Sequence, residues 1–134
     1  MKIRIESGLP FVTISLNYRG QQITLDKVLL DTGSMGTIFS ADKMDAIDLL
    51  PEPDDFIHQI RGVGGSEFVF TKQVDFLKAD ALQVENFQIE VGAMKYGFDI
   101  DGIIGLDFLI ETKAIIDFSQ LELRTSKSQK ENSQ

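Results

Sequence analysis

The sequence of 134 residues is 43% hydrophobic and 25% charged, the proportions of an ordinary globular domain. Its net charge of −8, with no cluster of lysine or arginine, argues against nucleic acid as a partner, because phosphate binding depends on basic side chains. The absence of cysteine excludes disulfides, thiolate metal ligands and thiol nucleophiles. Every apolar run is shorter than the ~20 residues of a membrane span, so we expect a cytoplasmic protein without a membrane partner.

Short runs that alternate between apolar and polar residues, separated by turn formers, are typical of β-strands. In chain order, the expected strands are 2–6, 11–17, 22–30, 37–40, 55–60, 66–76, 82–91, 113–118 and 121–124. Two of the turns between them are expected at Arg19-Gly20 and Ser119-Gln120.

Two short helices interrupt the predicted strands. The first is expected over 41–50, with Ser40 as its N-cap and Pro51 as its stop, and the second over 105–112. We therefore predict one all-β domain over residues 1–125. The tail 126–134 has no apolar residue and is expected to be disordered.

The stretch VLLDTGS, residues 28–34, carries an apolar strand directly into Asp31. One interpretation is an ordinary turn, since Asp31, Gly33 and Ser34 are all turn formers. The alternative is a catalytic carboxylate delivered by a rigid strand, with Gly33 allowing a tight turn and the Thr32 hydroxyl holding the loop. The triplet Asp-Thr-Gly does not decide between them, because short motifs recur by chance.

Other kinds of catalytic site have few candidate residues. His58 is the single histidine, so a Ser-His-Asp device would have to use it, and a zinc site would need further ligands. Its place in an expected strand arm is typical of a solvent-facing histidine. We therefore expect neither a metal nor another cofactor, and aspartate chemistry remains open.

The stretch IRGVGGSEFVF, residues 60–70, predicts a hairpin with a glycine-rich tip. Such a tip presents bare backbone groups and could fold over an extended peptide. A phosphate cradle and a plain hairpin turn are the competing interpretations. A phosphate cradle usually leads into a helix and often contains a lysine, and neither follows here, so only the plain hairpin turn stays open. The residues expected at the tip are Arg61, Gly62, Val63, Gly64, Gly65 and Ser66.

The stretch DIDGIIGLDFL, residues 99–109, contains Ile103-Ile104-Gly105, which repeats the apolar-strand-then-glycine layout of 29–33. A calcium loop of the EF-hand type is the rival interpretation. In that register Gly97 and Phe108 occupy the two outer ligand positions, where neither can supply a side-chain oxygen. The calcium interpretation is therefore rejected.

The order of LLDTGS, then GVGG in a hairpin, then GIIGLDFL resembles the retropepsin-like aspartic proteases, particularly the small single-domain bacterial type. The resemblance covers about residues 5–124. It implies an acid-protease barrel with a glycine-rich flap at 61–66. It also implies that two chains pair, with Asp31 as the catalytic aspartate, the Thr32 hydroxyl crossing to the partner loop, and Gly33 and Ser34 in the active-site loop. Ile103, Ile104 and Gly105 match the structural motif behind that loop.

The resemblance has two departures. Retroviral members continue their motif to a second aspartate and carry an arginine after the later glycine, where this chain has Met35 and Leu106. We expect these two residues to replace the charged pair by an apolar contact. The polar tail also offers no obvious strand for the usual dimer sheet.

The function predicted is that of an aspartic endopeptidase. Its homodimer would hydrolyse polypeptides with a water activated by two Asp31 carboxylates, one from each chain. The alternative is a non-catalytic peptide-binding or interaction module on the same fold.

Overall fold

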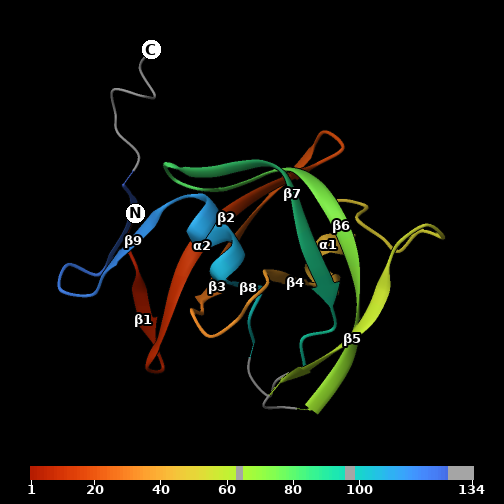
Figure 1. Ribbon diagram of the computed structural model, residues 1–134, viewed down its shortest axis with the longest axis horizontal. Helices are drawn as coiled ribbons and strands as arrows, with labels where there is room; N and C mark the ends of the chain where they lie inside the picture. Colours follow the sequence, from red (N-terminus) through yellow and green to blue (C-terminus); the bar gives the residue numbers. More distant parts are fainter. Residues whose placement is uncertain (63–64, 96–98, 127–134) are drawn as a thin grey trace.

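The computed structural model describes residues 1–62, 65–95 and 99–126, and these form strands with two short helices (Figure 1). The strands are β1 (Arg4–Glu6), β2 (Leu9–Tyr18), β3 (Gln21–Leu30), β4 (Ile38–Ser40), β5 (Ile57–Gly62), β6 (Gly65–Ala79), β7 (Leu82–Gly92), β8 (Gly102–Ile104), β9 (Ala114–Asp117) and β10 (Glu122–Thr125). The helices are α1 (Ala41–Asp45) and α2 (Leu106–Glu111). The all-β class is confirmed.

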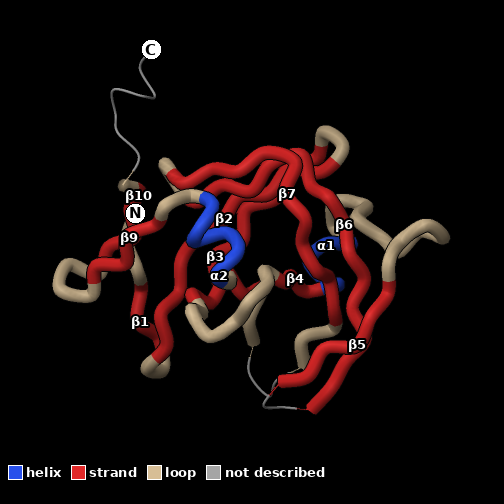
Figure 2. Tube along the Cα trace, viewed as in Figure 1, coloured by secondary structure: helices blue, strands red, loops and turns tan. Residues whose placement is uncertain are grey.

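The main sheet folds back on itself. Its strand order is β1-β2-β3-β8-β4-β7-β6-β5, and β2 also pairs with β6. Six strands, in the order β2-β3-β8-β4-β7-β6, therefore close into an irregular ring rather than a regular barrel. Strands β1 and β5 extend the sheet beyond β2 and β6 (Figure 2). The hairpin of β9 and β10 is a separate two-stranded sheet.

Period-two burial explains why these segments form strands. On β2, Val12, Ile14 and Leu16 are fully buried, while the residues between them are partly exposed. The buried side chains meet those of β3, β6, β7 and β10, and Phe108 of α2 enters the same cluster. The core therefore lies inside the ring of strands. The loops between these strands, including the loop after β3, start and end at residues whose neighbours are packed in this core.

Helix α1 is shorter than the predicted 41–50, because it ends at Asp45. Asp48 has a φ of 56°, in the left-handed region, and Leu49 N donates to Met44 O at 3.1 Å, which closes the chain into a turn. Ser40 does occupy the N-cap position, but its side chain makes no capping hydrogen bond. Helix α2 falls within the predicted 105–112.

The N-terminal segment pairs with β10 and the turn before it. Met1 N donates to Leu123 O at 2.7 Å, Leu123 N donates to Met1 O at 2.8 Å, and Ile3 N donates to Leu121 O at 2.8 Å. The disorder predicted for 126–134 falls, except for Ser126, outside the described residues. Within the described part of the chain, neither helix has the length and apolar character needed to cross a membrane.

Candidate active site

The loop that contains Asp31 begins where β3 leaves the sheet. Strand β3 pairs in parallel with β8, so that Leu30 lies opposite Ile104, and Asp31 N donates to Ile104 O at 3.0 Å. Leu30 and Ile104 are both buried. The backbone of Asp31 is therefore fixed by a buried strand pair rather than by the loop alone.

The carboxylate of Asp31 is oriented by its own loop. Gly33 N donates to Asp31 Oδ1 at 2.9 Å, and Ser34 N donates to Asp31 O at 3.2 Å. Ser34 Oγ donates to Gly36 O at 2.8 Å, which closes the turn. Asp31 is half-buried, whereas Thr32 and Gly33 are exposed. The site in one chain is thus a positioned carboxylate on an open surface.

The predicted structural motif lies directly behind this loop. Ile103 and Ile104 are in β8, and Gly105 is the N-cap of α2. A Cβ atom on Gly105 would lie 2.3 Å from Gly36 O and 2.8 Å from Ser34 O, distances that backbone atoms cannot accommodate. Only glycine therefore allows α2 to begin so close to the Asp31 loop.

A buried polar link between the loop and α2 was missed from the sequence. Thr37 is 1% exposed, and its Oγ1 donates to Asp107 Oδ1 at 2.7 Å while accepting a hydrogen bond from Gly105 N at 3.1 Å. Thr37 N also donates to Asp107 Oδ2 at 3.3 Å. The sequence does contain two residues that could have indicated this link. Thr37 has a hydroxyl group just after the loop, and Asp107 has a carboxylate in the first turn of α2.

The expected apolar pair of Met35 and Leu106 is corrected by the structure. Met35 is 85% exposed and Leu106 is 36% exposed, so they do not form a buried contact in place of an ion pair. The connection at this point is made by the backbone, because Leu106 N donates to Ser34 O at 2.8 Å and Asp107 N donates to Met35 O at 3.2 Å. Both side chains are left facing outward.

The predicted glycine-rich hairpin is formed by β5 and β6, with Gly62 opposite Gly65 in the last pair. Arg61 and Ser66 form the preceding pair, and Gly65 has a φ of 114°, a conformation that favours glycine. Val63 and Gly64 lie outside the described residues. In Figure 1 this end of the hairpin and the loop after β3 both face the lower side of the view.

His58 connects the hairpin to the strand beside the loop. It is part-buried rather than solvent-facing, and its Nε2 lies 2.5 Å from Glu90 Oε2 on β7. The backbone of Glu90 is bonded to the same loop, because Glu90 N donates to Thr37 O at 3.0 Å. The second carboxylate oxygen of Glu90, Oε1, lies close to Gly36: a Cβ atom added to this glycine would be 2.8 Å from it. The pair therefore joins an arm of the hairpin to the strand that borders the Asp31 loop.

A second apolar cluster lies between the hairpin and β4 and β8. Its buried members are Phe11, Ile38, Val69, Met94 and Ile100, and Ile60 and Ile103 are among the partly buried residues packed against it. Ile60 belongs to β5, and Ile103 belongs to the motif behind the loop. The cluster provides an apolar surface on which an arm of the hairpin rests.

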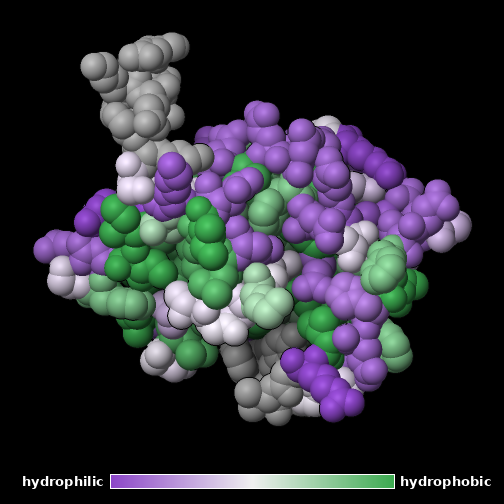
Figure 3. Space-filling view, in the orientation of Figure 1, coloured by the Kyte–Doolittle hydropathy of each residue, from purple (hydrophilic) through white to green (hydrophobic). Residues whose placement is uncertain are grey.

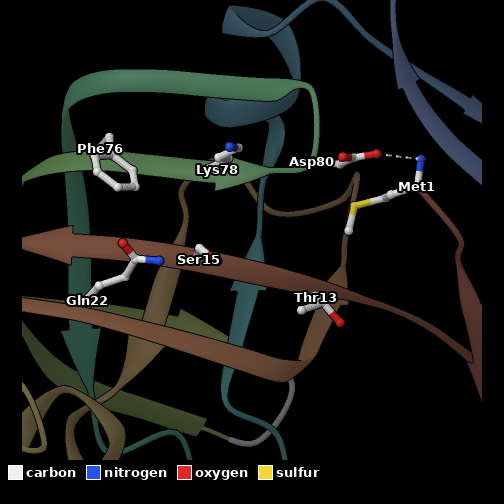
Figure 4. A pocket seen from close by; sticks show the side chains of 7 residues that line it. All are labelled: Met1, Thr13, Ser15, Gln22, Phe76, Lys78 and Asp80. Atoms are coloured by element: carbon white, nitrogen blue, oxygen red, sulfur yellow. Dashed lines mark ion pairs between the residues drawn. The ribbon is translucent and has the colours of Figure 1, made fainter.

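A pocket of about 400 Å³ lies elsewhere, between β2, β3 and β6 (Figure 4). Met1, Thr13, Ser15, Gln22, Phe76, Lys78 and Asp80 line it. Its one carboxylate, that of Asp80, lies 3.7 Å from the N-terminal ammonium group, and Asp31 is not part of it. Within the described residues, no group of three or more histidine, aspartate or glutamate side chains is placed to hold a metal ion.

The fold and the loop define the class of the protein, and comparison with known families agrees. Residues 12–108, more than half of the chain, match the aspartyl protease family, which is of the retropepsin-like type, and the chain belongs to that family. The match spans both the Asp31 loop and the motif at 103–105. A comparison with curated proteins found no match to the chain.

Proposed function

We propose that the protein is an aspartic endopeptidase whose active site is assembled from two chains, each contributing Asp31. The observation that carries this proposal is the Asp31 loop, which is held on β8 and α2 and presents its carboxylate at an open surface. The chain has a single Asp-Thr-Gly sequence, and Ile103-Ile104 stands in the corresponding place of the second glycine motif. A second carboxylate therefore has to come from a second copy.

The proposed mechanism needs only the two carboxylates and a water molecule. Two carboxyl groups held ~3 Å apart share one proton, because both cannot be ionised at that distance. The ionised group removes a proton from the water as the water oxygen attacks the peptide carbonyl carbon, and the protonated group donates its proton to the carbonyl oxygen. The tetrahedral intermediate then collapses: the carboxyl group that took the water proton gives it to the amide nitrogen, the C–N bond breaks and the amine leaves, while the other carboxylate takes back the proton of the hydroxyl group. No covalent intermediate is formed with the protein.

The proposed substrate is an extended polypeptide lying between the Asp31 loop and the hairpin. Residues 61–66 act as a flap whose backbone groups bond the substrate main chain, in the manner of strand addition. Two features support this: the hairpin is glycine-rich, and the His58–Glu90 contact joins it to the strand beside the loop. The apolar cluster with Ile60 and Ile103 would support the flap from below.

The test is hydrolysis of unfolded casein at mildly acidic pH, compared between the wild type and Asp31→Asn. Asp26→Asn, which alters an exposed aspartate on β3, is the matched control. We expect Asp31→Asn to abolish cleavage and Asp26→Asn to retain it. A wild type that binds casein without cleaving it at any chain concentration would contradict the proposal and favour the non-catalytic peptide-binding module.

A further inference from the structure

We infer that His58 and Glu90 are positioning residues: their contact fixes the hairpin of β5 and β6 relative to the Asp31 loop, and thereby sets where a bound peptide lies against the Asp31 carboxylate. The inference rests on the proposed function, in which the peptide lies between the hairpin and this loop. It adds the residues that fix the spacing between the two, which the proposed mechanism leaves open.

The hairpin has one exposed face and one face that packs on the rest of the molecule. On the exposed face, Ile57 is 62% exposed and Phe68 is 71% exposed. Figure 3 shows hydrophobic and hydrophilic residues side by side over β5, so this surface has no uniform character. Side chains that extend into solvent cannot hold the hairpin in place. Its position therefore depends on the other face.

The packed face of the hairpin consists of two cross-strand pairs, because His58 lies opposite Val69 and Ile60 lies opposite Glu67. Val69 is buried in the second apolar cluster, and Ile60 packs against that cluster. The carboxylate of Glu67 accepts a hydrogen bond from Met94 N at 3.1 Å. His58 adds a polar contact to β7 on the same face.

The imidazole of His58 is held by Glu90. Its Nε2 lies 2.5 Å from Glu90 Oε2, and the two side chains are 35% and 23% exposed. An ionised carboxylate accepts hydrogen bonds but cannot donate them, so the N–H of Nε2 is the donor. Nδ1 is buried and has no hydrogen-bond partner among the described residues, and the ring of Phe56 lies beside the imidazole with its centroid 5.9 Å away. The orientation of the imidazole therefore depends on Glu90.

Glu90 is in turn attached to the loop that contains Asp31. Its backbone N donates to Thr37 O at 3.0 Å, and its Oε1 lies so close to Gly36 that a Cβ atom there would be 2.8 Å away. Gly36 O accepts a hydrogen bond from Ser34 Oγ at 2.8 Å, and Ser34 N donates to Asp31 O. The Glu90 carboxylate thus lies between the imidazole of the hairpin and the backbone of the loop.

A displaced hairpin would displace the peptide with it. In strand addition the main chain of the peptide bonds to the backbone of the hairpin. The spacing between hairpin and loop then sets the distance from the peptide carbonyl carbon to the attacking water. A misplacement of about 1 Å can lower a rate about 100-fold, because the reacting atoms have to be close and aligned. Loss of the contact should therefore lower kcat, whereas a bond with a merely structural role would affect stability alone.

The first experiment compares His58→Leu and Glu90→Leu with the control Gln59→Leu. Gln59 Nε2 donates to Ser66 Oγ at 3.0 Å, so the control removes a polar contact from the exposed face of the same hairpin. Initial rates of casein cleavage are measured over a range of casein concentrations, at one chain concentration and at a temperature where thermal unfolding shows every variant to be folded. We expect kcat/KM to fall about tenfold or more in the first two variants, with a lower kcat, and to be unchanged in the control. Equal losses in all three, or an unchanged kcat in the first two, would overturn the inference.

Two further variants test the contact itself. In His58→Gln the side-chain amide can donate in place of Nε2, so this variant should recover most of the kcat/KM that His58→Leu loses. The double variant His58→Leu/Glu90→Leu should lose about as much as either single variant, because all three lack the same contact. Failure of His58→Gln to recover activity, or losses that multiply in the double variant, would overturn the inference.

Failure of the inference can be told from failure of the proposed function. If the wild type cleaves casein and His58→Leu cleaves it equally well, the inference fails and the proposed function stands. If the wild type binds casein without cleaving it, the proposed function fails and the affinity for casein decides the inference. A dissociation constant raised about tenfold or more in His58→Leu, but not in Gln59→Leu, would then uphold it, and equal constants would overturn it. A wild type that neither binds nor cleaves casein would overturn both.

Discussion

Thr37 and Asp107, 70 residues apart in the sequence, form the polar link that fastens the Asp31 loop to α2. Thr37 Oγ1 lies 2.7 Å from Asp107 Oδ1, and the same hydroxyl accepts the hydrogen bond from Gly105 N at 3.1 Å. Thr37 and Gly105 are both buried, so Gly105 N would be left without an acceptor if the hydroxyl were lost, whereas Asp107 Oδ1 would keep the hydrogen bond from Phe108 N. The link makes the loop, the glycine motif and the helix a single unit.

Thr37→Val should therefore destabilise the protein, although valine has nearly the same shape as threonine. We expect the free energy of unfolding to fall by about 1–3 kcal/mol, the cost of leaving the buried Gly105 N–H without an acceptor. Urea denaturation followed by circular dichroism measures this loss. Thr37→Ser, which keeps the hydroxyl, should cost clearly less; equal losses for the two variants would contradict the importance of the hydrogen bonds.

Gly105→Ala should disturb the active-site loop through direct steric conflict. The new Cβ would lie 2.3 Å from Gly36 O, so either the loop or the start of α2 has to move. Overpacking of this kind typically costs about 1–3 kcal/mol of stability. We expect the variant to lose most of its casein cleavage at temperatures where it is still folded. Activity equal to the wild type would show that the close approach is not needed to position Asp31.

The lowered pKa of Glu52 predicts how the free energy of unfolding changes at acidic pH. The guanidinium of Arg19 donates to both its carboxylate oxygens, at 2.9 and 3.0 Å, and Lys72 Nζ contacts Oε1. The hydrogen bond from Arg19 and then that from Lys72 lower the pKa of Glu52 from 4.5 to about 2. Since the folded pKa is the lower one, the stabilisation is present above pH 4.5 and is lost as the pH falls through about 2.

The measurement for Glu52 is the melting temperature between neutral pH and pH 2, compared with Glu52→Gln. The variant should melt lower at neutral pH, and its melting temperature should fall less over the acidic window, because it has no carboxylate to protonate. Glu85→Gln, which alters an exposed carboxylate on β7, is the control. If the melting temperatures of wild type and Glu52→Gln fell equally between neutral pH and pH 2, the stabilising role of the ionised Glu52 would be contradicted.

Activity should depend on chain concentration if the site needs two copies of Asp31. Cleavage per chain should rise with protein concentration until the dimer is saturated, and moderate salt should help by screening the charge of −8 on each chain. Adding excess Asp31→Asn chains should inhibit the wild type, because mixed dimers have one ionisable carboxylate. Constant activity per chain on deep dilution, with no inhibition by the variant, would contradict a shared site.

The regular part of the fold could be predicted from sequence, because it depends on local patterns. Alternating apolar residues such as Val12, Ile14 and Leu16 identify a strand with one buried face, and Arg19-Gly20 identifies its turn. The loop at Asp31 and the motif ending at Gly105 were also recognisable, because each keeps its characteristic residues within a short segment.

The tertiary structure decided how those segments meet. The bonds of Thr37 to Asp107 and of His58 to Glu90 join residues 70 and 32 positions apart, and no local period relates such positions. Met35 and Leu106 do not form the expected buried apolar pair: backbone hydrogen bonds hold these two segments together, and both side chains lie at the surface. The sequence by itself therefore determined the strands, the catalytic candidate and the glycine motif. Which side chains face one another across the loop depended on the ring of strands that brings β3, β4, β7 and β8 side by side.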